Sequence, residues 1–471
     1  MLNQTLQEKY PHLEIRVLKL SEVQKDNESK RIDSEFFKKE YFDAMETMQL
    51  NQVEYLGDNM KFNSRYSQPK YDETSKIKVI NSQYIRNEYI DYENAKSGYG
   101  KIVPKESVLI NATGVGTLGR VFINILDFDF SIDSHINVIV VKNKTYLNPY
   151  FLAIFLQSYY GQIQIIRYYS GTSGQIEIYP RDFNYFKIPI FPMEFQLEIQ
   201  NLVKDSHKAL EESKELYKKA EETLYLELGL DPKNPLQSLL DSKTNNPTNS
   251  PNISIHTLKE SFLKTGRLDS EYYQSKYEDI EKFIKSYPNG YDSFSSIINN
   301  KDTNFTPKNN ENYSYIELAN IGNNGNISEP ISDLGKNLPT RARRIVSKGD
   351  VIISSIEGSL SSCALITQEF DKHLVSTGFF VLNSKLLNGE TLLVMFKSQI
   401  FQEYLKKFPS GTILCAINKE ELSKILIPKI DSTTQEKIAK YIQESFNLRK
   451  KSKQLLDNAK IKVEEQIQGK I

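Results

Sequence analysis

Two long segments of the chain, residues 194–228 and 434–468, repeat apolar and small residues at a helical period. In both segments, every seventh position carries an isoleucine, then two serines and then an alanine. The two series match at an offset of 239: Ile199, Ser206, Ser213 and Ala220 against Ile438, Ser445, Ser452 and Ala459. The sequence therefore predicts two similar helices of about 35 residues, each roughly 50 Å long.

A second row runs beside the first, with Ala209 between two leucines in one helix and with Tyr441 followed by two leucines in the other. Together the two rows form a stripe only wide enough for one partner helix, so we expect the helices to pair with each other, most simply as an antiparallel coiled coil. The alternative is that each helix packs on its own domain. The predicted core of the pair is Ile199, Leu202, Ser206, Leu216, Ala220, Ile438, Tyr441, Ser445, Leu448, Leu455 and Ala459.

The rest of the chain alternates short β-branched runs with Gly, Asn and Asp turns. Residues 107–126 and 136–141 are typical of strands. We therefore expect a mixed α+β protein in which α/β domains alternate with the two long helices.

The chain is also an internal repeat. The heptapeptide at 31–37, RIDSEFF, returns at 267–273 as RLDSEYY, and further pairs follow in the same order up to 188–203 and 427–442. A period of about 235 residues is too long for a solenoid, so it predicts two copies of one domain plan with pseudo-twofold symmetry. The expected boundaries are a first domain at 1–192, a helix at 193–230, an exposed linker at 231–252, a second domain at 253–430 and a helix at 431–471.

Composition narrows the class. The 471 residues are 39% hydrophobic, which is typical of a soluble globular protein. We expect no secretory signal, and the longest apolar stretch, near residues 150–156, is too short to span a membrane. Cys363 and Cys415 are isolated, so neither a disulfide nor a metal site is expected, and a cytoplasmic location fits. The net charge of zero speaks against a simple nucleic-acid protein, but residues 61–191 carry 15 basic against 11 acidic side chains.

Two motifs look chemical. Gly114, Gly116 and Gly119 match the G-x-G-x-x-G dinucleotide fingerprint, but a strand-like run follows instead of the required helix, so we expect a β-hairpin turn. Residues 148–150, Asn-Pro-Tyr, are similar to the Asn-Pro-Pro-Tyr motif of amino-methyltransferases, but the second proline and a loop for S-adenosylmethionine are missing. We therefore predict no catalytic residue.

Amide, hydroxyl and basic side chains gather in the loops of both halves, and the polar loops 170–182 and 409–421 lie at equivalent places before the long helices. Arginine can bind guanine bidentately, Gln and Asn can do so with adenine, and Lys and hydroxyl groups bind phosphate. The alternative for each residue is ordinary surface polarity. The candidate DNA-binding residues are Gln83, Arg86, Lys101, Thr117, Arg120, Thr172, Ser173, Gln175 and Arg181 in the first half, and Asn320, Arg341, Arg343, Arg344, Ser359, Ser410, Thr412 and Lys419 in the second.

The order of these features resembles the specificity subunit of type I restriction-modification systems. The resemblance is carried by the Arg-x-Asp-Ser-Glu motif that opens each half, by the strand at 347–359, and by the Ser-Gly-Thr loop that leads through Ile-Pro into a helix start containing Gln196 or Gln435. It implies two target recognition domains that each read one half of a split, asymmetric DNA site, with the paired helices as spacer. A rod of roughly 50 Å exceeds one turn of DNA, about 34 to 36 Å.

The resemblance also implies partners. Such a subunit has no catalytic site and no cofactor of its own; it binds double-stranded DNA and two methyltransferase subunits, and restriction subunits join the complex. S-adenosylmethionine, Mg and ATP are then expected on the partner subunits only. Two alternatives stay open: an enzyme, either a methyltransferase acting through residues 148–150 or a nuclease, and a scaffold whose domains bind protein.

Overall fold

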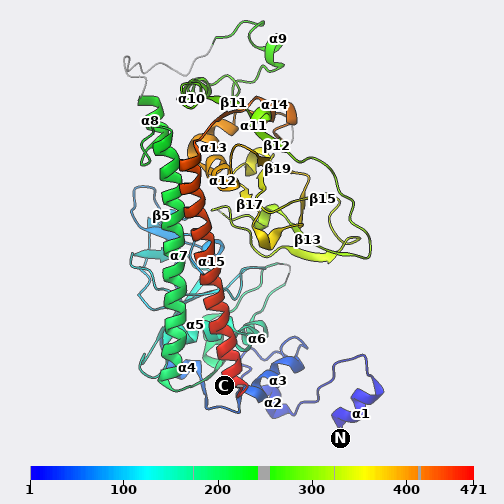
Figure 1. Ribbon diagram of the computed structural model, residues 1–471. Coiled ribbons are helices and arrows are strands. Elements are labelled where there is room, and N and C mark those ends of the chain that lie inside the picture. Colours follow the sequence, from blue (N-terminus) through cyan, green and yellow to red (C-terminus); the bar gives the residue numbers. More distant parts are fainter. Residues whose placement is uncertain (1, 173, 242–254, 323, 412–414, 471) are drawn as a thin grey trace. The chain divides into compact units, whose positions relative to one another are not determined.

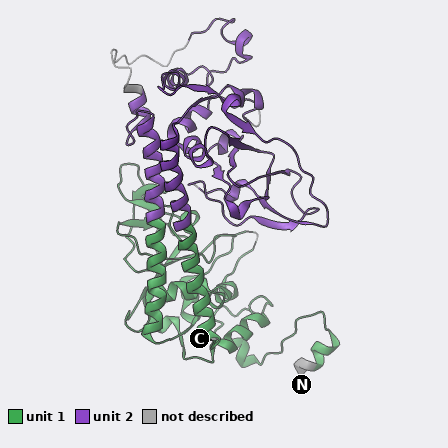
Figure 2. Cartoon of the chain, viewed as in Figure 1, with its two compact units in different colours: residues 1–211, 449–471 green, residues 212–448 purple. Residues whose placement is uncertain are grey.

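The computed structural model describes residues 2–172, 174–241, 255–322, 324–411 and 415–470. The chain forms two compact units (Figure 2). Unit 1 comprises residues 1–211 and 449–471, and unit 2 comprises residues 212–448. Both contain helices and strands, which confirms the mixed fold. Within the described ranges, no helix is both long enough and apolar enough to cross a membrane.

Unit 1 contains two four-stranded sheets, ordered β2-β9-β6-β7 and β3-β5-β4-β8. All neighbours are antiparallel except β4 and β8. The predicted strands are confirmed as β6, β7 and β9. The strand bounds are β2 (Met60–Arg65), β3 (Lys70–Tyr71), β4 (Lys78–Ile80), β5 (Lys96–Tyr99), β6 (Val108–Asn111), β7 (Val121–Ile123), β8 (Phe130–Ile132) and β9 (Ile136–Val141), with a separate pair formed by β1 (Val53–Tyr55) and β10 (Lys187–Pro189).

The helices within the mixed segment of unit 1 were not foreseen from the sequence. α5 is buried along almost its whole length, so its sequence, PYFLAIFLQ, has no polar face and no helical period to detect. The helix bounds are α1 (Leu2–Lys9), α2 (Leu20–Gln24), α3 (Lys39–Met48), α4 (Leu56–Asn59), α5 (Pro149–Gln157) and α6 (Tyr159–Tyr168).

Unit 2 repeats this plan. Its sheets are ordered β12-β19-β16-β17 and β14-β13-β18-β15, and again one neighbouring pair, β13 and β18, is parallel. The strand bounds are β11 (Tyr291–Ser293), β12 (Ile298–Asn300), β13 (Asn312–Ile316), β14 (Ile331–Leu334), β15 (Ala342–Ile345), β16 (Val351–Ser354), β17 (Cys363–Leu365), β18 (Leu374–Ser376), β19 (Phe379–Ser384) and β20 (Leu426–Pro428). The helix bounds are α8 (Pro235–Asp241), α9 (Phe262–Thr265), α10 (Ser275–Lys285), α11 (Phe294–Ile297), α12 (Gly389–Lys397), α13 (Gln399–Leu405) and α14 (Lys419–Lys424).

The two long helices, α7 (Met193–Glu227) and α15 (Ser432–Ile467), lie side by side and antiparallel (Figure 1). In unit 1 the hydroxyls of Ser206 and Ser452 are 2.9 Å apart, and in unit 2 those of Ser213 and Ser445 are 3.0 Å apart. Each pair adds a hydroxyl-to-carbonyl bond across the seam. The serines are thus buried and hydrogen-bonded, and the predicted helix pair is confirmed.

The first predicted row of the pair is buried throughout, but the second is only partly so. Leu202, Leu216, Tyr441, Leu448 and Leu455 are half-buried. A row of more deeply buried side chains lies one residue further along each helix. It consists of Val203, Leu210, Tyr217 and Leu224 in α7, and of Ile442, Leu456 and Val463 in α15.

The buried row is shifted because both long helices also pack on the domain of each unit. In unit 1 the ends of both helices share one apolar cluster with α3, α5 and α6, and in unit 2 they share one with α10, α12 and α13. The buried face is therefore wider than a two-helix seam and is centred differently. Pairing and packing on a domain, which we treated as alternatives, occur together.

The predicted linker, residues 231–252, contains a helix at its start. Leu239 of α8 is buried in the core of unit 2. Residues 242–252 lie outside the described part of the chain.

Candidate DNA interface

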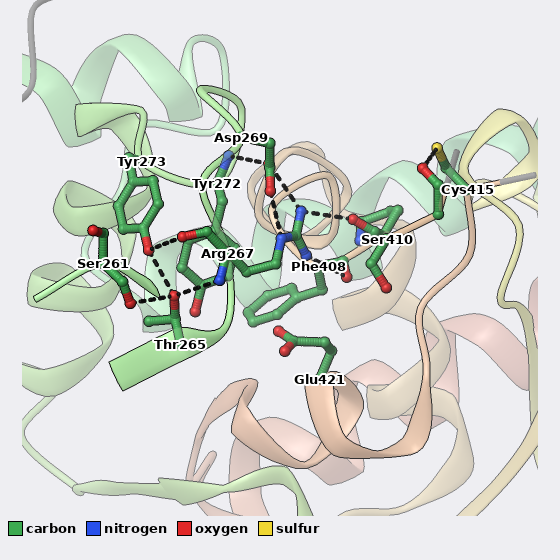
Figure 3. Close-up of polar contacts among 12 residues, drawn as sticks. Ser261, Thr265, Arg267, Asp269, Tyr272, Tyr273, Phe408, Ser410, Cys415 and Glu421 are labelled. Atoms are coloured by element: carbon green, nitrogen blue, oxygen red, sulfur yellow. Dashed lines mark hydrogen bonds and ion pairs between the residues drawn. The ribbon is translucent and has the colours of Figure 1, made fainter. Parts of the chain in front are cut away.

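The repeated Arg-x-Asp-Ser-Glu motif forms a clamp at the start of each polar loop. In unit 2, Arg267 donates two hydrogen bonds to the carboxylate of Asp269, at 2.6 and 2.9 Å (Figure 3). The same guanidinium donates to the carbonyl oxygens of Phe408, at 3.3 Å, and Pro409, at 2.9 Å. Asp269 also accepts from the backbone N–H of Tyr272. The motif therefore holds the backbone directly before Ser410.

Unit 1 contains the same clamp. Arg31 binds Asp33 with two bonds of 2.7 Å and donates to the carbonyl oxygens of Arg167, at 3.1 Å, and Tyr169, at 2.7 Å. The hydrogen bonds from Arg31 lower the pKa of Asp33 to about 2. In both units the most recognisable motif of the sequence thus positions a loop.

In unit 1 the loop 170–178 lies on the hairpin turn that joins β6 and β7. Backbone bonds run from the Gly114 N–H to the Ile176 carbonyl, at 3.0 Å, and from the Ile178 N–H to the Ala112 carbonyl, at 2.9 Å. Gly114, Gly116 and Gly119 all have positive φ, which glycine adopts without strain. The turn is followed by a strand and not by a helix, so the hairpin prediction is confirmed.

Four of the predicted residues of unit 1 gather beside this turn. Arg86 and Arg120 both donate to the carbonyl oxygen of Ile85, at 3.1 and 3.3 Å, and Arg86 also bonds the carbonyl of Gln83. Burial lowers the pKa of Arg120, with repulsion from Arg86 as a second cause. The fourth, Thr117, donates its hydroxyl to the turn itself.

The remaining predicted residues of unit 1 are spread out. Thr172 and Gln175 are exposed at the loop tip, and Ser173 lies outside the described residues. The ammonium group of Lys101 lies over the ring of Phe62, 4.7 Å from its centroid. Arg181 lies over the ring of Tyr179, beside Asp182.

Unit 2 repeats the contact between loop and turn. The Glu357 N–H donates to the Cys415 carbonyl, at 3.0 Å, and the Ile417 N–H donates to the Ser355 carbonyl, at 2.8 Å. Ser410 closes the base of the loop by two backbone bonds with Ala416. Thr412 lies outside the described residues.

The other predicted residues of unit 2 mostly bond to their own domain. Ser359 shares a hydrogen bond with Ser354, and Asn320 spans a turn by bonds to the backbone of Glu317 and Glu329. Lys419 forms an ion pair with Asp302.

The three arginines around β15 do not form one patch. Arg341 is exposed, Arg343 donates to the carbonyl of Thr340, and Arg344 is half-buried against the carbonyl of Phe379. Burial lowers the pKa of Arg344.

Residues 43–222 match the family model described as "Type I restriction modification DNA specificity domain". This stretch of the chain is similar to the type I restriction-modification specificity family. The match takes in both sheets of unit 1, the loop 170–178 and most of α7.

Several proteins of known name are similar to this chain. The Type I restriction enzyme HindI specificity subunit of Haemophilus influenzae is 29% identical over 129 residues, which cover 26% of this chain and 28% of that protein. The type I restriction-modification S subunit of M. genitalium aligns over 88% of this chain and 95% of its own, at 13% identity and a TM-score of 0.42. The HsdS subunit of Thermoanaerobacter tengcongensis aligns over 89% of this chain and 97% of its own, at 14% identity and a TM-score of 0.27. Both TM-scores lie below 0.5, so the likeness to this family rests on the sequence matches.

The Asn-Pro-Tyr segment has a structural role in unit 1. The side chain of Asn148 accepts from the Tyr150 N–H, which caps α5, and it donates to Gln200 at 2.8 Å. Asn388 caps α12 in unit 2 in the same way. Asn148 is buried and its amide is occupied, so the resemblance to a methyltransferase motif comes from helix capping.

Two glutamines that the sequence marked only as repeated form a second clamp. Gln196 accepts from the Asn148 N–H, at 2.7 Å, and donates to the carbonyls of Tyr146 and Phe191. Gln435 makes the equivalent three bonds to Asn388, Leu386 and Ile430. Their signal was their matched place, four residues into each long helix.

Two residues that hold the loop and the turn lie far from them in the sequence and were not predicted. Arg65, at the end of β2, binds Glu177 at the base of the loop, and His135 lies 3.1 Å from the hydroxyl of Thr113 in the turn. No local pattern marks either residue, because each contact joins segments far apart in the sequence.

Proposed function

We propose that this chain is the DNA-recognition subunit of a type I restriction-modification complex and that it reads a bipartite, asymmetric DNA site. One observation carries the proposal: a polar loop is held on a hairpin turn by the same backbone bonds twice in one chain. A duplicated reader supports a site with two halves. Because the two loops differ in their side chains, the two half-sites differ as well.

The chemistry around each loop suits base and phosphate contacts. Unit 1 offers the exposed amides of Gln83 and Gln175 and the guanidinium of Arg86, and unit 2 offers Arg341 and Lys419. Gln can pair with adenine and Arg with guanine in the major groove, while Lys binds phosphate. We infer that these side chains contact DNA.

The partners belong to the proposal too. Two methyltransferase subunits bind the chain and carry S-adenosylmethionine, and restriction subunits that use Mg and ATP join them. The chain itself contributes no catalytic residue. The occupied amide of Asn148 disfavours the reading as a methyltransferase in its own right. The complex then acts in the cytoplasm, where it meets DNA.

The test is modified-base sequencing of DNA from cells that express the neighbouring methyltransferase with and without this chain. We expect a split motif with a fixed gap that is present only with the chain. If both proteins are expressed and associate but no chain-dependent motif appears, the proposal is wrong and a protein-binding scaffold becomes the better explanation.

A further inference from the structure

The loop of unit 1 is tied to the end of β2 by Arg65. The guanidinium of Arg65 forms an ion pair with Glu177, donates a hydrogen bond to the carbonyl oxygen of Ile178, and lies over the ring of Tyr179, 5.7 Å from its centroid. These three residues form the C-terminal stem of the loop 170–178, and Arg31 holds the opposite stem through Tyr169. The exposed tip, with Gln175, is thus held from both sides.

Glu177 also connects the loop to the hairpin turn. It exchanges two backbone bonds of 2.8 Å with Ser170, which closes the loop, and it forms a β-bridge with Thr113. Arg65 therefore acts at the residue where loop and turn meet. Its side chain is 18% exposed and that of Glu177 is 32% exposed, so the pair is partly shielded from solvent.

Unit 2 ties its loop with the charges reversed. Asp302, just beyond the end of β12, forms an ion pair with Lys419 directly after the loop. Hydrogen bonding to Lys419 lowers the pKa of Asp302, and Arg344 adds a weaker attraction. This pair is more open than that of unit 1, with side-chain exposures of 43% and 65%. The position of the Glu177 bridge is taken by Ala416.

We propose that Arg65 is a positioning residue for the reading of one half-site and that the Arg65–Glu177 pair sets how the loop 170–178 meets DNA. This rests on the proposed function. Arg65 neutralises a carboxylate that would otherwise repel DNA phosphates, and it fixes the stem that carries Gln175. The Asp302–Lys419 pair has a smaller role, because exposed ion pairs are weak and are screened by salt.

The experiment is modified-base sequencing with the full chain and its methyltransferase, comparing wild type, Arg65→Met, Glu177→Gln and Asp302→Asn. For Arg65→Met we expect at least a tenfold loss of discrimination at one or more bases of a single half-site, with the other half-site and the gap unchanged. Glu177→Gln should relax the same bases to a smaller extent, so the inference does not depend on the folding of one variant. Asp302→Asn is the matched control and should leave those bases unchanged.

The outcomes separate this inference from the proposed function. An absent motif with the wild-type chain would count against the proposed function, whatever the variants do. A normal wild-type motif that stays unchanged in Arg65→Met and Glu177→Gln overturns the inference. So does an even loss of methylation over all sites with no base relaxed, because that result indicates a purely structural role.

Discussion

In each unit, one residue of a long helix caps the N-terminus of a short helix. The two capping residues occupy equivalent positions of the repeat, but one is a tyrosine and the other is a glutamate. In unit 2, the N–H of Gln399, at the start of α13, donates to the hydroxyl of Tyr225, at 2.8 Å. In unit 1, the N–H of Tyr159, at the start of α6, donates to the carboxylate of Glu464, at 2.7 Å. Tyr225 and Glu464 are 239 positions apart, the offset of the helix repeat. Duplication has kept the contact and left the side chain free to change.

A second pair of equivalent positions differs more strongly. Arg167 is 3% exposed and lies among aromatic rings, 3.9 Å from the centroid of Tyr41 and 4.1 Å from that of Phe36. In unit 2, Lys407 occupies the matching place before the loop and pairs with Glu281. Lys407 also lies over a ring, 5.0 Å from the centroid of Tyr272, so unit 2 adds a carboxylate to the ring contact that both units share. By contrast, the Arg–Asp clamps, the glutamine clamps and the serine layers are the same in both units.

The comparison teaches that the clamps, the serine layers and the sites of the two caps are shared, whereas the side chains that supply a cap or surround a buried cation have diverged. A clamp that binds main-chain carbonyls keeps working whatever the neighbouring side chains become. A side-chain pair can be replaced by another pair that fills the same place. In the proposed function, this division lets one scaffold carry two different reading loops.

The largest expected effect is the removal of a glutamine clamp. Gln196→Leu and Gln435→Leu each remove three hydrogen bonds and leave buried partners unsatisfied, so each should destabilise its domain by about 3 kcal/mol. Thermal melting of the full chain measures both, and Gln454→Leu, at an exposed position of α15, is the control. Nearly equal losses support the shared scaffold; a loss in only one unit breaks the comparison.

Removing the cap in each unit should lower the stability of the fold, and only the loss in unit 1 should depend on the salt concentration. Tyr225→Phe leaves the Gln399 N–H without its acceptor and should cost about 1 kcal/mol at any salt concentration. Glu464→Gln keeps an acceptor but removes a negative charge at the N-terminus of α6, which should cost about 0.5 kcal/mol at low salt and less at high salt. Melting temperatures at two ionic strengths test this. Equal salt dependence of the two variants would show that the cap chemistry has no energetic consequence.

The smallest expected effect is the contribution of Asp33 to the pH dependence of the stability. Because Arg31 holds the folded-state pKa of Asp33 at about 2, below its ordinary 3.8, the pair stabilises the fold above about pH 4 and loses this contribution as the pH falls toward 2. The carboxylate is 46% exposed, so screening by solvent limits the effect to about 0.3 kcal/mol. Asp33→Asn should therefore be less stable at pH 7 and show a flatter decline between pH 4 and 3 in thermal melts. An unchanged decline would mean that the clamp adds no pH-dependent stability.

Much of the fold was predictable because it depends on local periodicity. The long helices begin and end within two residues of the periodic segments 194–228 and 434–468, and β6, β7, β9 and the glycine turn lie where their patterns placed them. The helix α5 escaped detection because full burial removes the polar face. The second row of the helix pair shifted by one residue because the domains pack against it.

The candidate site was less predictable. The predicted residues Gln83, Arg86, Thr117 and Arg120 do lie together, beside the glycine turn. The partners of Arg344, Lys419 and Arg65 come from segments far away in the sequence, and no local pattern reveals them. Side chains that looked free to bind DNA, such as Asn320, prove to be bonded within their own turn.

One measurement tests most directly the proposed reading of a split DNA site, in which the paired helices are expected to set the gap between the two half-sites. Deleting residues 207–213 from α7 and 446–452 from α15 removes one repeat and brings Ser206 opposite Ser445, so the seam is preserved. Seven residues correspond to about 10 Å, or roughly three base pairs at 3.4 Å each. Modified-base sequencing should then show both half-sites intact with the gap shortened by about three base pairs. An unchanged gap or an altered half-site would contradict the account.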